Sequence, residues 1–359
     1  MGRGSYAAPS PLAVTPERFR IPAPRGNRNR SVYDRDALAA EAFTMRDGER
    51  TIRFGEGSLA EAPDLLQQGG FDGYTLLTTA RAASLLPSPS PVFVPPGLVE
   101  EISAQLLPQV AEGPLVAVGG GRVIDTAKAI AGVTGAPLAA IPTTLSGAEL
   151  TPFHRTPVGV DGARMVRPSL VIADPRLMAS QPGPQLWASA MNALAHGMEA
   201  LYTPLANPVA EAAALRGAQA IWNEELAFGA LLSGWASGMT GFAVHHATCQ
   251  NLVRTAGSPH AATNAVMLPH FAGMMAGRVP GVMGAFAQAL GDPAGDPGAA
   301  AGQAAKLAAR SGHTRLSTLG IEEAHLPQVA AAVMRHPALG NTPEPPDEDE
   351  LLALLRGSL

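Results

Sequence analysis

The sequence predicts two parts, an α/β part with a mainly parallel sheet and, after it, an all-helical part. Three observations lead to this prediction. The short apolar run 115–118 is followed at once by three glycines and an alanine-rich helical pattern. A second apolar run, 137–141, ends in a loop rich in hydroxyl groups, and from about residue 182 the chain reads as helix almost throughout. Strands that alternate with helices are typical of parallel sheets.

Length and composition indicate the domain organisation and exclude several classes of protein. With 359 residues the chain can form two domains. We predict a flexible extension over 1–50, an α/β nucleotide-binding domain over 51–180 and a helical domain over 181–359. A net charge of −5 argues against nucleic-acid binding, and the single cysteine fits a reducing compartment. No apolar run has the length of a membrane span and no secretory signal is evident, so we expect a cytoplasmic protein without a membrane partner.

Apolar runs and turn residues predict the elements of the α/β part in order. Residues 81–91 contain three prolines, which a helix interior excludes, so we expect a short connection after strand 74–80. No carboxylate ends that strand, and the usual partner of a cofactor ribose is therefore missing. The predicted elements are strand–turn–helix 50–70, strand 74–80, helix 99–110, strand 115–118, helix 123–132, strand 137–141 and a strand within 164–174.

The glycine turn Gly119–Gly121 indicates a phosphate site. Glycines let the backbone approach a ligand closely, and the amides of the first helical turn point at the anion. Asp125 lies in that turn, and Lys128 could add an ammonium to the site or pair with Asp125. The spacing is neither GxGxxG nor a P-loop, and a tight structural turn is the alternative. The loop 142–149 should meet this turn at the carboxyl edge of the sheet, where ligands bind.

The motifs GGGRVIDTAKAIA and IPTTLSGAELTP resemble those of the iron-containing alcohol dehydrogenase superfamily, and most closely its maleylacetate reductase branch. The resemblance runs from about residue 53 to the C-terminus. It implies a dehydroquinate synthase-like fold, an NADH or NADPH cofactor and a small substrate between the domains. The residues expected to contact the cofactor are Gly119, Gly120, Gly121, Arg122, Asp125, Lys128, Thr143, Thr144 and Ser146.

The helical part supplies a candidate histidine cluster. Asn192 and His196 share a helix face, and Glu199 follows three residues later. By resemblance, His246 and His260 match the second and third metal histidines of relatives. Metal-using relatives carry Asp at the position of Asn192, and a neutral amide is a poor ligand, so we expect no tightly bound iron or zinc. If a metal binds, Asn192, His196, His246 and His260 would hold it.

A further departure from the relatives lies at Gln250. The resemblance places a histidine there that is usually assigned to proton relay, and a glutamine cannot titrate. Gln250 can still orient a substrate carbonyl. We read Cys249 as a buried thiol. The predicted catalytic residues are His196, His246, His260, His245 and Gln250.

The leading functional hypothesis is an NAD(P)H-dependent reductase of a small polar carbonyl or enoate, with a histidine as proton donor. The alternative is a non-redox cyclase, dehydratase or isomerase of a biosynthetic pathway on the same scaffold, which the short segment 81–91 and Gln250 favour. A third is a binding subunit without turnover. We expect a homodimer from the usual frequency of such assemblies.

Overall fold

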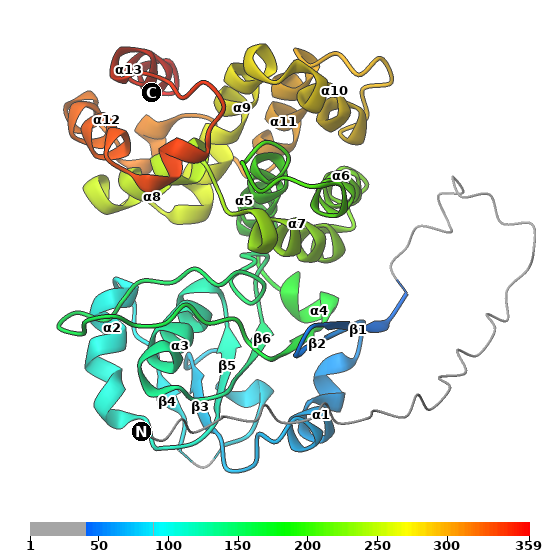
Figure 1. Ribbon diagram of the computed structural model, residues 1–359, viewed down its shortest axis with the longest axis vertical. Coiled ribbons are helices and arrows are strands. Elements are labelled where there is room, and N and C mark those ends of the chain that lie inside the picture. The colour runs from blue at the N-terminus through cyan, green and yellow to red at the C-terminus, as the bar shows by residue number, and fades with distance from the viewer. Residues whose placement is uncertain (1–40, 89) are drawn as a thin grey trace, which may run out of the picture. The chain divides into compact units, whose positions relative to one another are not determined.

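A seven-stranded sheet forms the first part of the computed structural model, which describes residues 41–88 and 90–359 (Figure 1). The strand order is β1-β2-β7-β6-β5-β3-β4, and all neighbours are parallel except β1 and β2. Every residue of the central strands β5 and β6 is buried, which explains their continuous apolar runs. The strands are β1 (Phe43–Asp47), β2 (Arg50–Phe54), β3 (Thr75–Thr78), β4 (Val92–Phe93), β5 (Leu115–Gly119), β6 (Leu138–Pro142) and β7 (Leu170–Ala173).

The sheet begins earlier than expected. Strand β1 pairs with β2 in a hairpin in which Asp47 lies opposite Arg50, so only Gly48 and Glu49 form the loop. Gly48 has a φ of +60°, and a glycine first in a two-residue loop is a hairpin signal. The structure therefore differs from the predicted extension over 43–50. The rest of that prediction, over 1–40, lies outside the described residues.

Helices cover both faces of the sheet. Alternate residues of β5, Leu115 and Ala117, pack with α2 (Val99–Leu106) and α3 (Gly121–Thr134). The intervening Val116 and Val118 pack with α1 (Ala62–Gln68) on the other face. In the connection from β3 to β4, residues 79–88 and 90–91 form no regular element other than the 3-10 turn η3 (Ala83–Leu85), which confirms the short connection predicted from its prolines.

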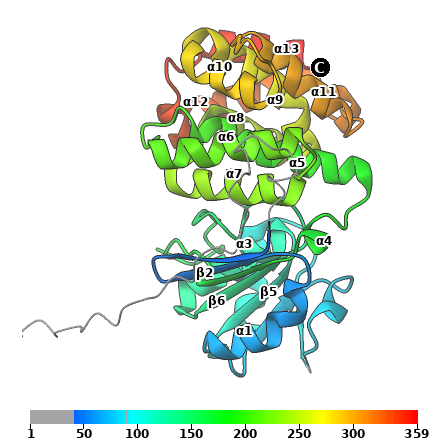
Figure 2. The same cartoon turned by 90° about the vertical axis from the view of Figure 1, so that its right-hand side faces the viewer.

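Residues 174–359 contain helices and loops but no strand, and with the parallel sheet this confirms the predicted fold class (Figure 2). The apolar stretch 218–237 is divided by a turn in which Glu224 has a φ of +67°. The α-helices are α4 (Pro175–Met178), α5 (Gly183–Ala200), α6 (Pro208–Trp222), α7 (Leu226–Thr240), α8 (Val244–Ala256), α9 (His260–Arg278), α10 (Pro280–Ala289), α11 (Ala299–Ala309), α12 (Leu326–Met334) and α13 (Glu348–Gly357). The 3-10 turns are η2 (Ser58–Glu61), η4 (Leu107–Gln109), η5 (Leu316–Leu319), η6 (Glu323–His325) and η7 (Pro337–Asn341).

Small residues bring the central helices close together. Helix α5 packs against α6, α7 and α9, and most of its side chains are buried. A Cβ on Gly217 of α6 would lie 2.6 Å from Ser233 Oγ of α7, and one on Gly229 would lie 2.6 Å from Ile221 Cγ1. The many Gly and Ala residues thus permit tight packing around α5, the helix that carries Asn192. No single described helix is long and apolar enough to cross a membrane; only the bent pair α7 and α8 reaches that length and composition together.

Candidate active site

A cleft of about 710 Å³ is lined by residues of both parts of the chain. Two hydrogen bonds connect the loop after β6 with α5. The Leu145 amide donates to Ser189 Oγ at 3.1 Å, and Asn192 Nδ2 donates to the Ser146 carbonyl at 3.3 Å. The predicted site residues that line this cleft are Gly121, Arg122, Asp125, Ser146, Asn192, His196, His246, Gln250 and His260. The predicted residues outside its lining are Gly119, Gly120, Lys128, Thr143, Thr144 and His245.

The glycine turn lets a neighbouring loop approach the start of α3. Gly119 ends β5, and Gly120 is the residue before the helix. A Cβ on Gly120 would lie 2.9 Å from Thr144 Cγ2, and a Cβ on Gly121 would lie 3.1 Å from Ser146 Cβ. No described side chain caps the amides at this helix start. Because Gly121 lines the cleft, an anion there can accept hydrogen bonds from those amides.

Lys128 is fully buried and holds the loop after β6. Its Nζ donates to the carbonyl oxygens of Ala148 at 2.8 Å and Thr151 at 3.1 Å, and it lies 2.8 Å from Asp125 Oδ1. A buried ammonium is stable only when such partners replace water. These contacts fix Ala148 and Thr151, both of which line the cleft, so Lys128 acts on the site through the loop.

The same loop carries a second buried charge, Glu149. Neither of its carboxylate oxygens has a hydrogen-bond partner among the described residues. The pKa of Glu149 is raised to about 7, mainly by burial and also by Asp125, while its own backbone amide, Lys128 and Arg50 act in the opposite direction. Glu149 is therefore a carboxyl group that titrates near neutral pH beneath the cleft wall.

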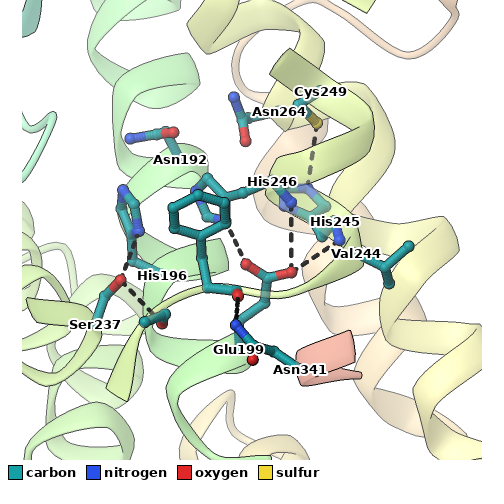
Figure 3. A network of polar contacts seen from close by, with 12 residues as sticks. Asn192, His196, Glu199, Ser237, Val244, His245, His246, Cys249, Asn264 and Asn341 are labelled. Carbon is teal, nitrogen blue, oxygen red and sulfur yellow. Dashed lines mark hydrogen bonds and ion pairs between the residues drawn. The ribbon is translucent and has the colours of Figure 1, made fainter. Parts of the chain in front are cut away.

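The central feature of the helical wall is a contact between α5 and α8 (Figure 3). Glu199 Oε2 lies 2.5 Å from His246 Nδ1, and Oε1 accepts the backbone N–H groups of His245 at 2.8 Å and His246 at 3.3 Å. Glu199 and His246 are both buried. As a carboxylate, Glu199 accepts a hydrogen bond from the N–H group at His246 Nδ1. The other ring nitrogen, Nε2, is then unprotonated, and it has no partner among the described residues. An unprotonated imidazole nitrogen is the form that binds a metal.

Asn192 and His196, which belong to α5, lie beside His246 of α8 (Figure 3). The rings of His196 and His246 are stacked with centroids 4.1 Å apart. His196 Nδ1 lies 3.1 Å from Ser237 Oγ, which fixes the orientation of its ring. Asn192 Oδ1 is buried and has no partner among the described residues. Unpaired buried acceptors in a native protein require an explanation, and a bound cation is one.

Burial keeps the histidines of this wall neutral. It lowers the pKa of His246 to about 3, with the charge of His260 as the second cause. It also lowers the pKa of His196 well below its usual value, with His246 and His260 as further causes. Burial raises the pKa of Glu199, which an electrostatic contribution from His245 and the backbone N–H donors oppose. Neutral imidazoles beside a carboxylate are a donor set suited to a divalent cation.

The two remaining predicted histidines have different surroundings. His245 packs against Phe271, and its Nε2 lies 3.7 Å from Cys249 Sγ. Burial raises the pKa of Cys249 well above its usual value, so the thiol is an unreactive one. His260 begins α9 and lines the cleft, where burial lowers its pKa. The structure thus brings His260 to the cleft and keeps His245 behind His246.

Several residues of the site were not predicted. Glu199 was noted only for its position, although a carboxylate in an otherwise apolar buried helix signals a partner. Arg155 lines the cleft and donates from Nη2 to Gln250 Oε1 at 3.0 Å. The sequence feature that could have indicated Arg155 is its position shortly after the loop 142–149 at the sheet edge. Further unpredicted lining residues include Phe153, His154, Phe242, Arg254 and His336.

Two family models match the chain on either side of the cleft. The model described as the Fe-containing alcohol dehydrogenase family, C-terminal, matches residues 187–359. The model described as iron-containing alcohol dehydrogenase matches residues 97–182. The first model spans all four residues that the sequence offered as metal ligands.

These findings correct the prediction that no metal is tightly bound. The family is iron-containing, and Glu199, His245 and His246 are buried with ligand atoms that all lie within 4.8 Å of one another. The prediction was wrong because it weighed only the missing charge of Asn192. It overlooked Glu199, whose carboxylate contacts His246 and supplies negative charge to the same group of side chains.

Relatives and solved structures agree with the models. The chain is 32% identical over 340 residues to the maleylacetate reductase of Pseudomonas knackmussii, covering 85% of this chain and 94% of that protein. It is 36% identical over 237 residues to maleylacetate reductase 1 of Rhodococcus opacus, covering 60% of this chain and 65% of that one. The crystal structure of maleylacetate reductase from Agrobacterium tumefaciens is similar with a TM-score of 0.73 and 27% identity, covering 89% of this chain and 98% of that one. By these matches the chain is an oxidoreductase that belongs to the iron-containing alcohol dehydrogenase family, in its maleylacetate reductase-like branch.

Proposed function

We propose that the chain reduces a small polar carbonyl or enoate of the maleylacetate class with NADH or NADPH. One observation carries the proposal: the uncapped start of α3 and the neutral histidines beside Asn192 line the same cleft, where a cofactor phosphate and a substrate can both bind. The similarity to maleylacetate reductases supports it. The non-redox alternative has no comparable support and is not retained.

We assign the cofactor to the sheet edge. Its pyrophosphate would accept hydrogen bonds from the turn Gly119–Arg122, because helix-start amides and close glycines suit an anion. Asp125 would fix the first turn of α3, and Lys128 would act through the loop that it holds. In this proposal Thr143, Thr144 and Ser146 form the side nearest the ribose and nicotinamide.

We assign the metal to Asn192, His196, His246 and His260. Asn192 Oδ1 and His246 Nε2 are buried acceptors without partners, which fits a cation between them. Glu199 contacts His246 at Nδ1, the ring nitrogen opposite the free Nε2, and so fixes the orientation of the ring. A divalent metal at such a site supplies Lewis-acid polarisation of a substrate oxygen.

The reduction requires one hydride and one proton. A dihydronicotinamide cofactor held at the sheet edge by the turn Gly119–Arg122 would supply the hydride for the electrophilic carbon of the substrate. Histidines that bind a metal through Nε2 cannot also release a proton from that atom, and Gln250 does not titrate. We therefore propose that a water molecule in the cleft supplies the proton and leaves a hydroxide that exchanges with solvent, which revises the expectation of a histidine donor.

The test is oxidation of NADH and NADPH in the presence of maleylacetate, with metal-supplied protein. We expect turnover with at least one cofactor and loss of turnover in His196→Ala. His313→Ala, outside the cleft lining, is the matched control and should retain activity. A folded, metal-loaded protein that oxidises neither cofactor with maleylacetate or another short oxo acid would sink the proposal. Homodimer formation, a cytoplasmic location and the domain boundary at residue 180 stay predictions.

A further inference from the structure

A guanidinium and an amide form a polar pair in the cleft. Arg155, from the segment between β6 and β7, donates from Nη2 to Gln250 Oε1 at 3.0 Å. Gln250 lies four residues after His246 on α8, so the two side chains occupy the same helix face one turn apart. Both Arg155 and Gln250 line the cleft with His246.

This contact fixes which way the Gln250 amide points. A guanidinium has five N–H donors and no acceptor, so the atom of Gln250 that faces it is the oxygen. The NH₂ group of Gln250 is then directed away from Arg155. One donor group of Arg155 is used by Gln250, and no other bond from its guanidinium to a described residue is present. The pair therefore offers several N–H donors, and its one acceptor oxygen already faces Arg155.

The charges around Arg155 also favour an anion. Partial desolvation and the positive charge of Arg254 lower the pKa of Arg155, while the carboxylates of Glu100 and Asp125 raise it. The two carboxylates among the cleft-lining residues are already paired: Glu100 with Arg254, and Asp125 with the buried Lys128. Arg155 forms no ion pair with any described carboxylate. A guanidinium without a direct ion-pair partner, next to carboxylates that are paired elsewhere, is suited to bind an anion.

We propose that Arg155 and Gln250 bind a carboxylate of the substrate and so determine its specificity. The inference rests on the proposed function, because it places this carboxylate in the same cleft as the reacting carbon. Four residues of helix rise by about 6 Å, which sets the spacing between the carboxylate and the group held at His246. The substrate class is a short-chain oxo or enoic acid with a carboxylate at that distance from the reacting centre.

The neutral amide of Gln250 determines what the cleft can recognise beside Arg155. A histidine beside Arg155 could become a second cation or give up its proton. A glutamine stays neutral and keeps its donors toward the cleft while Arg155 holds its oxygen. Gln250 thus provides fixed recognition of an acceptor oxygen and no proton transfer.

The first experiment compares Arg155→Met with the wild type and with Arg176→Met, an exposed arginine outside the cleft lining as control. KM for maleylacetate should rise at least tenfold in Arg155→Met, because a charge-assisted bond to a carboxylate is lost. Arg155→Lys should recover part of that loss. For an ester of maleylacetate that lacks the recognised negative charge, KM should be the same in Arg155→Met and in the wild type. Equal KM values for the acid in Arg155→Met and the wild type would refute the proposal.

The second experiment does not need turnover, and it separates this inference from the proposed function. Calorimetric titration with glutarate, a short dicarboxylate, should show binding to the wild type that is at least tenfold weaker in Arg155→Met. Gln250→Glu should weaken it too, because a carboxylate there neutralises Arg155 and repels the ligand. Dimethyl glutarate should not distinguish the variants. If glutarate does not bind the wild type, or binds all variants equally, the carboxylate site is wrong even where reductase activity is present.

Discussion

Replacing Glu199 by Gln tests whether the buried carboxylate prepares His246 for a metal. Glu199 accepts three N–H donors, two from the backbone and one from His246 Nδ1. A glutamine has one oxygen and one NH₂ group in the same space. If its oxygen accepts the backbone donors, its NH₂ group faces His246 Nδ1. Nδ1 must then accept, and the ring proton moves to Nε2, the atom needed by a metal.

The magnitude follows from this mismatch. To bind a metal, His246 in the variant must keep its proton on Nδ1, where it meets the NH₂ group and leaves a buried donor unsatisfied. Such a group costs about 1–3 kcal/mol, which corresponds to a decrease of roughly 5- to 150-fold in metal affinity. Replacing a partner that orients a metal ligand in other proteins costs about 10- to 100-fold, in the same range.

The assay is titration of metal-free protein with Co²⁺, followed by its absorption spectrum and by competition with a chelator. Glu323→Gln, in an exposed ion pair with Arg356, is the matched control and should bind like the wild type. Thermal unfolding of both variants separates a loss of affinity from a loss of fold. Wild-type Co²⁺ affinity in a folded Glu199→Gln would refute the reasoning.

Three further predictions follow from the described contacts. Asn192→Asp should tighten Co²⁺ binding in the same titration, because the unpaired Oδ1 becomes part of a carboxylate; unchanged or weaker binding contradicts this. Gly120→Val should lower the melting temperature and weaken NADH binding, because its Cβ would lie 2.9 Å from Thr144 Cγ2, and an unchanged fluorescence titration would remove the turn from the site. Burial raises the pKa of Glu149 to about 7 from 4.5, so wild-type stability should fall as the pH rises between these values. Glu149→Gln should remove that dependence, worth about 3 kcal/mol by denaturant unfolding, and a parallel pH profile in both proteins would disprove it.

The elements most readable from the sequence were those buried on both faces. Strands β5 and β6 are apolar along their whole length because helices pack on each side of them, so their pattern did not depend on knowing the neighbours. Strand β1 and its hairpin turn were missed because two of the five β1 residues are exposed, none is fully buried, and the signal is a single glycine at position 48. A partly exposed edge strand has too little apolar pattern to predict on its own.

The site was predictable where the residues lie close in sequence and not where distant segments meet. Asn192 and His196 share one helix face, and their spacing alone placed them together. The contacts from Glu199 to His246 and from Arg155 to Gln250 join segments separated by 47 and 95 residues. Such pairs arise from the way α5, α8 and the loop after β6 pack, which spacing along the chain does not reveal.

The metal prediction shows why charge must be counted over a buried group and not over its ligands alone. A carboxylate across one imidazole ring lies about 6 Å from a bound ion instead of about 2 Å, and Coulomb's law leaves it about one-third of the attraction of a direct ligand. The contact at 2.5 Å between Glu199 and His246 keeps that distance short, and burial limits screening by water. Glu199 therefore offsets part of the charge that Asn192 lacks. It follows that Asn192→Asp should gain less affinity in the wild-type background than in Glu199→Gln, where the remote charge is gone, and an equal gain in both backgrounds would show that the two positions do not share the ion.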